Sequence, residues 1–339
     1  MRLLIILLLC GGVGSAADVT VYMYSEYIDP AIPGEFTAAT GIGVTLDVYE
    51  AQEEMLAKLQ AGGLGQYDVV VASDVMIAQM IALQLLAPLD KRLIPNATHL
   101  WTRFADPVYD RGNAYTLPYL WGTIGIAYRR DAFAAPPTWA AVLDPAAAVG
   151  PFVLMDEARS MLGSTLVHLG RPANSRDPAD LAAAAAALGA AKADARCLGF
   201  DNGVAGLRRV AAGEAVAAVT YNGDAVREQD VDPGIGFAVP AEGGIVTVDN
   251  LCIAAKAPDP AAAHAFIDFL YRPEVAARNA ATMRYATPNQ AALPLIDAKH
   301  RADPGIYPPD EQMGRLHVLE DLGADTRLYD ETWARIKAE

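Results

Sequence analysis

Acidic and aromatic residues lie together where two predicted strands end. Residues 19–24 alternate apolar and polar side chains, and residues 215–220 are apolar, so both segments predict strands. In an open α/β sheet, ligands bind beyond the carboxyl ends of the strands. Acids that receive N–H donors, beside phenol rings that cover methylenes, suit a positively charged ligand with a hydrocarbon body. The residues at these two ends are Tyr24, Ser25, Glu26 and Tyr27, and Tyr221 with Asp224.

Three more predicted strands carry polar residues in or after them. Asp249 interrupts the apolar run 245–254, where a carboxylate is costly unless a cation or hydrogen-bond donors satisfy it. Ser73 and Asp74 follow the apolar strand 67–72; a helix cap suffices to explain Asp74, whereas Ser73 is a candidate site residue. Glu157 follows the apolar segment 152–155 and precedes a predicted helix, so it is either a ligand-binding residue or an N-cap.

The elements that must position these residues alternate between strands and helices. Strands at 19–24, 43–48 and 67–72 are separated by helices at 32–40 and 53–60, and this order predicts an α/β fold with a doubly wound open sheet. We expect two discontinuous lobes, joined by extended strands near 124–128 and 246–250, with a ligand cleft between them. The expected boundaries are 18–125 plus 248–298 for the first lobe and 126–247 plus 299–339 for the second.

The first 17 residues predict a secretory signal peptide. Arg2 is followed by an apolar run to Cys10, and the small residues Gly14, Ser15 and Ala16 stand just before the expected cleavage site. Cys10 would be the attachment site of a lipoprotein, but Leu9 is larger than the small residue normally needed before it, so lipid anchoring is less expected. The mature chain is therefore predicted to be exported to the periplasm. It keeps Cys197 and Cys252, which either pair in that oxidising compartment or remain separate thiols.

The composition excludes some function classes. The 339-residue chain has a formal net charge of −15, which disfavours nucleic acid and anionic membranes as partners and attracts cations, although acidity also serves solubility. The mature chain contains no His-Glu-x-x-His, P-loop, Gly-x-Ser-x-Gly or Cys-x-x-Cys motif, and its histidines are scattered. We expect neither an enzyme nor a cofactor or metal site, and we expect a monomer.

The chain resembles the periplasmic polyamine-binding proteins of ABC importers, the putrescine- and spermidine-binding group, over nearly the whole mature sequence. The order and spacing of several short spans carry the resemblance, and the last of them is more similar to the putrescine-binding branch. These spans are 22–27, 67–73, 118–122, 221–224, 240–244, 248–249, 266–273, 287–289 and 303–309. The resemblance implies a type II periplasmic-binding-protein fold whose two lobes close on the ligand, with a membrane permease and an ATPase as partners.

The resemblance also implies which residues bind the ligand. The first pocket motif of the family matches the segment 24–27, with a tyrosine where tryptophan is usual. Six further pocket positions of the family also have counterparts here. They are the pocket serine, the acid that opens a helix of the second lobe, the aromatic residue and the acid that follow a strand of that lobe, the hinge aspartate and the pocket tyrosine. The implied set is Tyr24, Ser25, Glu26, Tyr27, Ser73, Glu157, Tyr221, Asp224, Asp249 and Tyr285.

Some positions depart from the family pattern and leave the ligand open. Thr247 replaces an aromatic residue, Ser160 replaces a second acid, and Val75 and Leu319 stand where spermidine binders have Tyr and Gln. These departures favour putrescine or a similar diamine, followed by spermidine. The alternatives are a binding protein for another small organic cation or for a non-amine solute, and a sensory receptor that uses the same fold.

Overall fold

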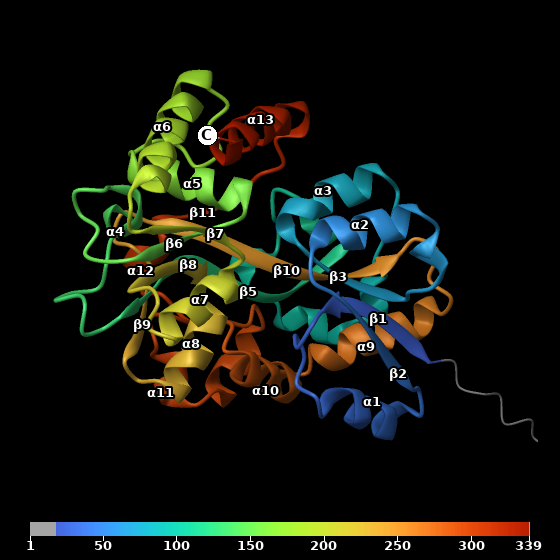
Figure 1. Ribbon diagram of the computed structural model, residues 1–339. Coiled ribbons are helices and arrows are strands. Elements are labelled where there is room, and N and C mark those ends of the chain that lie inside the picture. The colour runs from blue at the N-terminus through green and yellow to red at the C-terminus, as the bar shows by residue number, and fades with distance from the viewer. Residues whose placement is uncertain (1–17, 339) are drawn as a thin grey trace, which may run out of the picture.

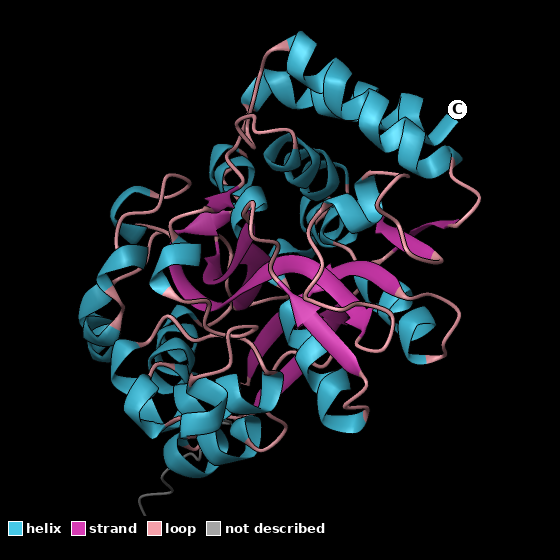
Figure 2. Ribbon diagram, turned by 90° about the vertical axis from the view of Figure 1, so that its left-hand side faces the viewer, coloured by secondary structure: helices cyan, strands magenta, loops and turns pink. Residues whose placement is uncertain are grey.

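The computed structural model describes residues 18–338 of the chain, so the predicted signal peptide lies outside the described residues. The molecule is α/β, as predicted, and Figure 1 shows two lobes side by side with strand β10 running from one into the other. The strands form one continuous curled sheet in the order β2-β1-β3-β10-β5-β8-β6-β7. Helices lie on both sides of the strands, as the turned view in Figure 2 shows.

The first lobe is built on the predicted parallel strands. Strand β1 pairs in parallel with β2 and β3, and β3 pairs antiparallel with β10. Every residue of β3 is buried, which is typical of a strand covered on both faces. The strands that belong mainly to this lobe are β1 (Val19–Tyr24), β2 (Val44–Tyr49), β3 (Val69–Ser73) and β4 (Leu86–Ala87).

The second lobe continues the same sheet. Strand β8 pairs antiparallel with β5, while β6 pairs in parallel with β7 and β8. Strand β9 pairs with β5, and β11 pairs with the beginning of β10. The strands of this lobe are β6 (Phe152–Met155), β7 (Cys197–Asp201), β8 (Ala217–Tyr221), β9 (Ile235–Ala238) and β11 (Leu316–Val318).

Two long strands, β5 (Thr116–Arg129) and β10 (Gly244–Ala254), run through both lobes and pair antiparallel with each other. They include the predicted crossings near 124–128 and 246–250, and β5 begins at Thr116, before the first of these crossings. The register between the strands shifts between Asp249 and Asn250. Asn250 is aligned with Pro118, and a β-bulge is one of the places where a sheet tolerates a proline.

Helices connect the strands, and several begin and end as the sequence predicts. Gly41 ends α1 in the left-handed conformation (φ 77°), which glycine adopts without a steric penalty, and the Asp177 side chain caps α6 by accepting from the Ala179 N–H. Ser73 stands at the N-cap position of α3, but its side chain makes no capping bond. The helices are α1 (Ile32–Thr40), α2 (Gln52–Gln60), α3 (Asp74–Ala82), α4 (Ala140–Leu143), α5 (Ala158–His168), α6 (Pro178–Ala193), α7 (Gly203–Ala211), α8 (Asn222–Val231), α9 (Pro260–Leu270), α10 (Pro273–Met283), α11 (Ala298–Arg301), α12 (Asp310–Met313) and α13 (Thr326–Ala338).

The largest hydrophobic cluster of each lobe is distinct, and a smaller cluster that includes Trp121, Val226 and Ala286 joins the lobes. One core joins Phe36 of α1 to Phe266 and Phe269 of α9, with ring centroids 5.2 and 5.5 Å apart. The other joins Phe152 and Leu166 to residues of the C-terminal helix α13, such as Tyr329. Distinct main cores allow lobes to move as units about the strands that join them. The expected lobe boundaries stay a prediction.

Candidate ligand-binding site

Three buried or partly buried carboxylates near the junction of the lobes each accept a hydrogen bond from a tyrosine hydroxyl. Tyr27 donates to Asp249 at 2.5 Å, Tyr221 donates to Glu157 at 2.5 Å, and Tyr285 donates to Asp224 at 3.2 Å. All six of these residues are among those that the sequence predicted for the site. The structure therefore brings together side chains that come from positions as far apart as 27 and 285.

Asp249 occupies the central position of this group, inside β10. It is aligned with Ser73 of β3 on one side and with Leu120 of β5 on the other, so its carboxylate lies where the two lobes share strands. Burial raises the pKa of the Asp249 carboxyl to about 6; the hydrogen bond from Tyr27 opposes this rise, and the charge of Glu157 adds to it. Asp249 is thus a carboxylate near neutral pH that lacks a countercharge of its own.

Glu157 lies at the N-cap position of α5, but its side chain does not cap the helix. Its carboxylate instead accepts hydrogen bonds from the Tyr221 hydroxyl and, at 2.9 Å, from the Ser160 hydroxyl. Burial raises the pKa of Glu157, and these two hydrogen bonds oppose the rise. The sequence left two roles open for Glu157, an N-cap and a ligand-binding residue, and its side chain does not act as the cap.

Tyr285 reaches Asp224 across a floor made of glycine backbone. A Cβ atom on Gly223 would lie 2.2 Å from the Tyr285 ring, and one on Gly122 would lie 2.8 Å from it. Real Cβ atoms do not approach that closely, so the ring can lie here only because both residues lack a side chain. Arg284, just before Tyr285, has φ 60° and ends α10 in the left-handed conformation, which turns the chain toward the site.

Aromatic rings form the wall between these carboxylates. The Tyr27 ring contacts the Tyr24 and Tyr285 rings edge to face, with centroids 5.4 and 5.6 Å apart. Tyr221, from the second lobe, packs against the core of the first lobe together with Tyr24. Aromatic faces of this kind can cover methylene groups and attract a cation, for roughly 0.5–2 kcal/mol per contact.

Comparison with known proteins identifies the family. Residues 32–308 match the family model of the bacterial extracellular solute-binding proteins. The chain belongs to this family. It is 32% identical to the spermidine/putrescine-binding periplasmic protein of Escherichia coli over 323 residues, which cover 94% of this chain and 92% of that protein. It is also 32% identical to the putrescine-binding periplasmic protein SpuD of Pseudomonas aeruginosa, with 96% and 94% of the two chains covered.

Solved structures agree with this identification. A putative spermidine/putrescine ABC transporter protein from Listeria monocytogenes superposes with a TM-score of 0.84 at 32% identity, covering 95% of this chain and 99% of that one. This match confirms the predicted fold of the solute-binding protein, with two lobes and a discontinuous chain. The relatives are substrate-binding components of transporters and not enzymes, and those named above from E. coli and P. aeruginosa are periplasmic. Within residues 18–338, no helix is both long and apolar enough to cross a membrane.

Ser25 and Glu26 are the most solvent-exposed of the predicted site residues of this solute-binding protein. Both are exposed, and Glu26 has φ 52°, a left-handed conformation at the turn after β1. Glu26 is linked to the acid–tyrosine group through its charge, which contributes to the raised pKa of Asp224.

Ser73 is buried and held by a residue that the sequence analysis did not single out. The Gln52 side chain donates to the Ser73 hydroxyl oxygen at 2.9 Å and accepts from the Ser73 backbone N–H at 3.0 Å. This bidentate contact joins the start of α2 to the end of β3. A glutamine at the first position of a predicted helix carries no distinctive sequence signal, because such positions are often polar and exposed.

Arg227 is the second residue that the sequence analysis missed. It lies one helical turn after Asp224 on α8 and forms an ion pair with that carboxylate. Burial raises the pKa of Asp224, and the Arg227 guanidinium and the Tyr285 hydroxyl oppose the rise. The i,i+3 spacing of an acid and a base was visible in the sequence, but it is so common on exposed helices that it predicts no site.

Asp74 differs from the expected helix-cap aspartate. It is the first residue of α3 and is buried, with 2% of its surface exposed. One carboxyl oxygen accepts from the Val75 N–H at 3.0 Å, and the other has no partner within the described residues. Burial raises the pKa of Asp74 well above its ordinary value, and the charge of Asp249 adds to the rise.

Proposed function

We propose that this solute-binding protein captures putrescine or a closely related diamine between its two lobes and delivers it to an ABC importer. The observation that carries the proposal is the group of three carboxylates, each bonded to a tyrosine hydroxyl, at the junction of the lobes. A diamine has an ammonium at each end of a short hydrocarbon chain. Each ammonium loses its water on entry and needs oxygen acceptors at a matched distance.

The hydrogen-bonding capacity of the site fits an ammonium ligand. A carboxylate has about four lone-pair positions, and one tyrosine donor occupies only one of them. The tyrosine oxygen itself keeps lone pairs that can accept from the ammonium. Asp249 and Glu157 would bind one end of the ligand, and Asp224 with Glu26 would bind the other, while Tyr24, Tyr27, Tyr221 and Tyr285 would cover the methylenes.

Closure is the proposed signal to the transporter. Asp249 and Tyr27 belong to elements of the first lobe, whereas Glu157, Tyr221 and Asp224 belong to elements of the second. A ligand that contacts both sets binds the closed form better than the open form, so it shifts the population toward closure about β5 and β10. A permease and an ATPase in the inner membrane would then recognise the closed, monomeric protein. The expected lobe boundaries, 18–125 plus 248–298 and 126–247 plus 299–339, are part of this proposal.

A thermal-shift screen tests the proposal. The purified mature protein is heated with putrescine, cadaverine, spermidine, amino acids and Ca²⁺ in separate samples, because a ligand that binds only the native state raises the melting temperature. We expect the largest rise with putrescine or cadaverine, followed by calorimetry to obtain Kd. A rise with amino acids or Ca²⁺ and none with any amine would reject the proposal.

A further inference from the structure

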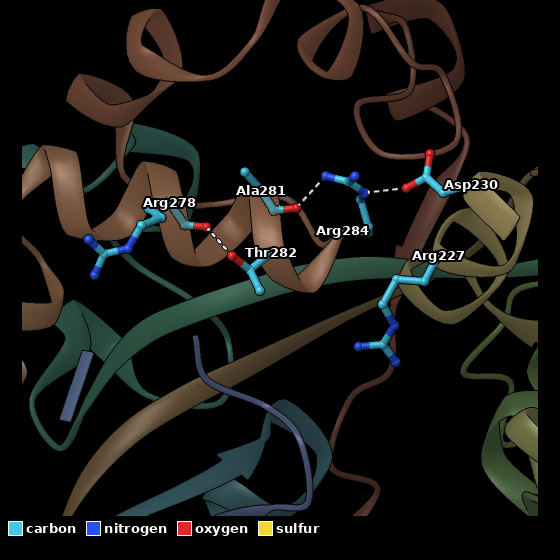
Figure 3. A pocket seen from close by; sticks show the side chains of 6 residues that line it. All are labelled: Arg227, Asp230, Arg278, Ala281, Thr282 and Arg284. Atoms are coloured by element: carbon cyan, nitrogen blue, oxygen red, sulfur yellow. Dashed lines mark hydrogen bonds and ion pairs between the residues drawn. The ribbon is translucent and has the colours of Figure 1, made fainter. Parts of the chain in front are cut away.

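A hollow of about 430 Å³ lies between helices α8 and α10. Figure 3 shows that Arg227 and Asp230 reach it from α8, while Arg278, Ala281 and Thr282 reach it from α10 together with Arg284. Three arginines therefore line one hollow in a chain whose net charge is −15. Their ionic partners differ, and this difference separates Arg227 from the other two.

Arg278 and Arg284 are paired with acids outside the candidate site. Arg278 contacts Glu35 at 2.7 Å, and Arg284 contacts Asp230 at 2.7 Å. Arg227 instead forms its ion pair with Asp224, a carboxylate of the candidate site itself. Within residues 18–338, Asp224 is the one acid found within ion-pair distance of Arg227.

The Asp224 carboxylate already accepts two donors, one on each oxygen. Arg227 Nη2 donates to Oδ1 of Asp224, and the Tyr285 hydroxyl donates to Oδ2. The Asp224 side chain is 12% exposed and that of Arg227 is 37% exposed, so the ion pair joins a largely buried carboxylate to a partly exposed guanidinium. The spacing of three residues on α8 keeps both side chains on the same face of the helix.

The charge at this end of the site follows from these contacts. Glu26 and Asp224 together carry two negative charges, and Arg227 compensates one of them. A diamine brings one ammonium to this end, which the remaining negative charge balances. A triamine with its first ammonium at Asp249 would bring further positive charge toward an aspartate that already has a cation.

We propose that Arg227 is a specificity-determining residue: it acts as a resident cation on Asp224, so that the site favours ligands with two positive charges over ligands with three. This inference rests on the proposed function, because it concerns discrimination among amines. It assigns to Arg227 no contact with the ligand; the residue acts through the carboxylate that the ligand needs.

The test compares two ligands on matched variants by calorimetry at one salt concentration. The quantity measured is the ratio of Kd for spermidine to Kd for putrescine. We expect the wild-type protein to bind putrescine more tightly, and Arg227→Gln to lower the ratio by about tenfold, as expected when one charge is removed beside a partly buried acid. Arg227→Lys keeps the positive charge and should keep most of the discrimination.

Arg284→Gln is the control, because it removes a positive charge from the same hollow but leaves Asp224 paired. It should change the Kd of both ligands by the same factor and leave the ratio within about twofold. Melting temperatures show whether each variant is folded, and because Arg227 is partly exposed we expect its replacement to be tolerated.

The outcomes separate this inference from the proposed function. If both amines bind and Arg227→Gln leaves the ratio within twofold of the wild-type value, the inference is wrong and the proposed function stands. The same conclusion follows if the wild-type protein prefers spermidine. If neither amine binds the wild-type protein, both proposals fail. Tight binding of 4-aminobutyrate that is lost in Arg227→Gln would show that the guanidinium receives a carboxylate, which also contradicts the inference.

Discussion

Three acids of the candidate site, Asp249, Glu157 and Asp224, each accept a hydrogen bond from a tyrosine hydroxyl and have a pKa raised by burial. The tyrosine hydroxyl orients the carboxylate without neutralising it, because a phenol stays protonated at neutral pH. Burial removes the water that would otherwise solvate the charge, so an ammonium that arrives finds an acceptor with few competitors. At the scale of single residues, affinity for a cation therefore depends on carboxylates that the unliganded protein leaves without a full countercharge.

Asp249→Asn should abolish diamine binding while the fold survives. The amide is close in size to the carboxylate but carries no charge and has only one acceptor oxygen, so an ammonium loses its partner at a desolvated position. We expect Kd for putrescine to rise by at least about 100-fold, the effect of breaking a buried charged contact worth roughly 3 kcal/mol.

Calorimetry on the folded variant checks this loss, with Glu311→Gln as the control. Glu311 lies on α12 with an 84% exposed side chain, so its replacement removes one negative charge at the surface and should leave Kd nearly unchanged. Near wild-type affinity of the Asp249→Asn variant would show that this carboxylate does not receive the ligand.

Diamine affinity should fall as the pH falls below about 6. Burial raises the pKa of Asp249 to about 6, so below that pH the unliganded site holds a proton that an ammonium must displace. The raised pKa values of Glu157 and Asp224 make the fall steeper. Calorimetric titrations at several pH values should show that the affinity for the diamine falls by nearly tenfold per pH unit below pH 6 and is constant between pH 7 and pH 8.

Constant affinity between pH 5 and pH 7.5 would contradict this prediction.

The same pKa shift acts on stability in the unliganded protein. Because the folded-state pKa of Asp249 is raised, its contribution to the free energy of unfolding is present below about pH 4 and is lost as the pH rises through about 6.

At the scale of elements, the site depends on where helices begin and where strands pair. Tyr221 ends β8 and Asp224 lies in the first turn of α8, so one strand-to-helix junction supplies a ring and an acid. Tyr285 meets this junction only because the end of α10 approaches Gly223. The contact between α8 and the residues after α10 therefore connects the two lobes at the edge of the site.

Gly223→Ala should weaken diamine binding by about tenfold or more. The new Cβ would lie 2.2 Å from the Tyr285 ring, so the ring must move and its hydroxyl loses Asp224. Calorimetry measures the affinity, and thermal unfolding measures the stability. We expect the unfolding measurement to show whether the loss of affinity goes with a loss of stability.

Gly189→Ala provides the matched control for that substitution. Gly189 lies inside α6, where a Cβ meets nothing within 4 Å, so alanine should raise the free energy of unfolding by up to about 1 kcal/mol and leave Kd unchanged. If Gly223→Ala bound putrescine as the wild-type protein does, the glycine floor would have no role in ligand binding.

At the scale of the whole molecule, the two cores and the two shared strands define how the protein can move. β5 and β10 are the long strands that pair with elements of both lobes, and Asp249 lies on one of them. Rotation about these strands opens or closes the site without disrupting either core. The strongly negative net charge attracts cations that come closer to the protein surface than the screening length of the solution.

Putrescine should make the protein more compact and more stable. Small-angle X-ray scattering should show a smaller radius of gyration with saturating ligand, because a ligand that contacts both lobes favours the closed form. At a free concentration of about 100 times Kd, binding should add roughly 2.7 kcal/mol to the free energy of unfolding. The Asp249→Asn variant should show neither change, and binding by the wild-type protein without compaction would contradict the closure mechanism.

Local patterns in the sequence were enough to predict most of the first lobe and the candidate residues. Alternating strands and helices at 19–60, the glycine that ends α1 and the aspartate that caps α6 are short-range features, and the structure contains all of them. The predicted site residues could be recognised one at a time, because each follows a strand or interrupts an apolar run. Asp249 was recognisable because a carboxylate inside a buried strand needs a physical explanation.

Only the tertiary structure decided which side chains meet. The pairs Tyr27–Asp249, Tyr221–Glu157 and Tyr285–Asp224 join positions 61 to 222 residues apart, and no local pattern encodes such a contact. The full length of β5 depends on its pairing with β10, where the register shift beside Asn250 accommodates Pro118. The roles of Gln52 and Arg227 depend on packing between elements, since a polar residue at a helix start and an i,i+3 ion pair are ordinary until the chain folds and places them against Ser73 and Asp224.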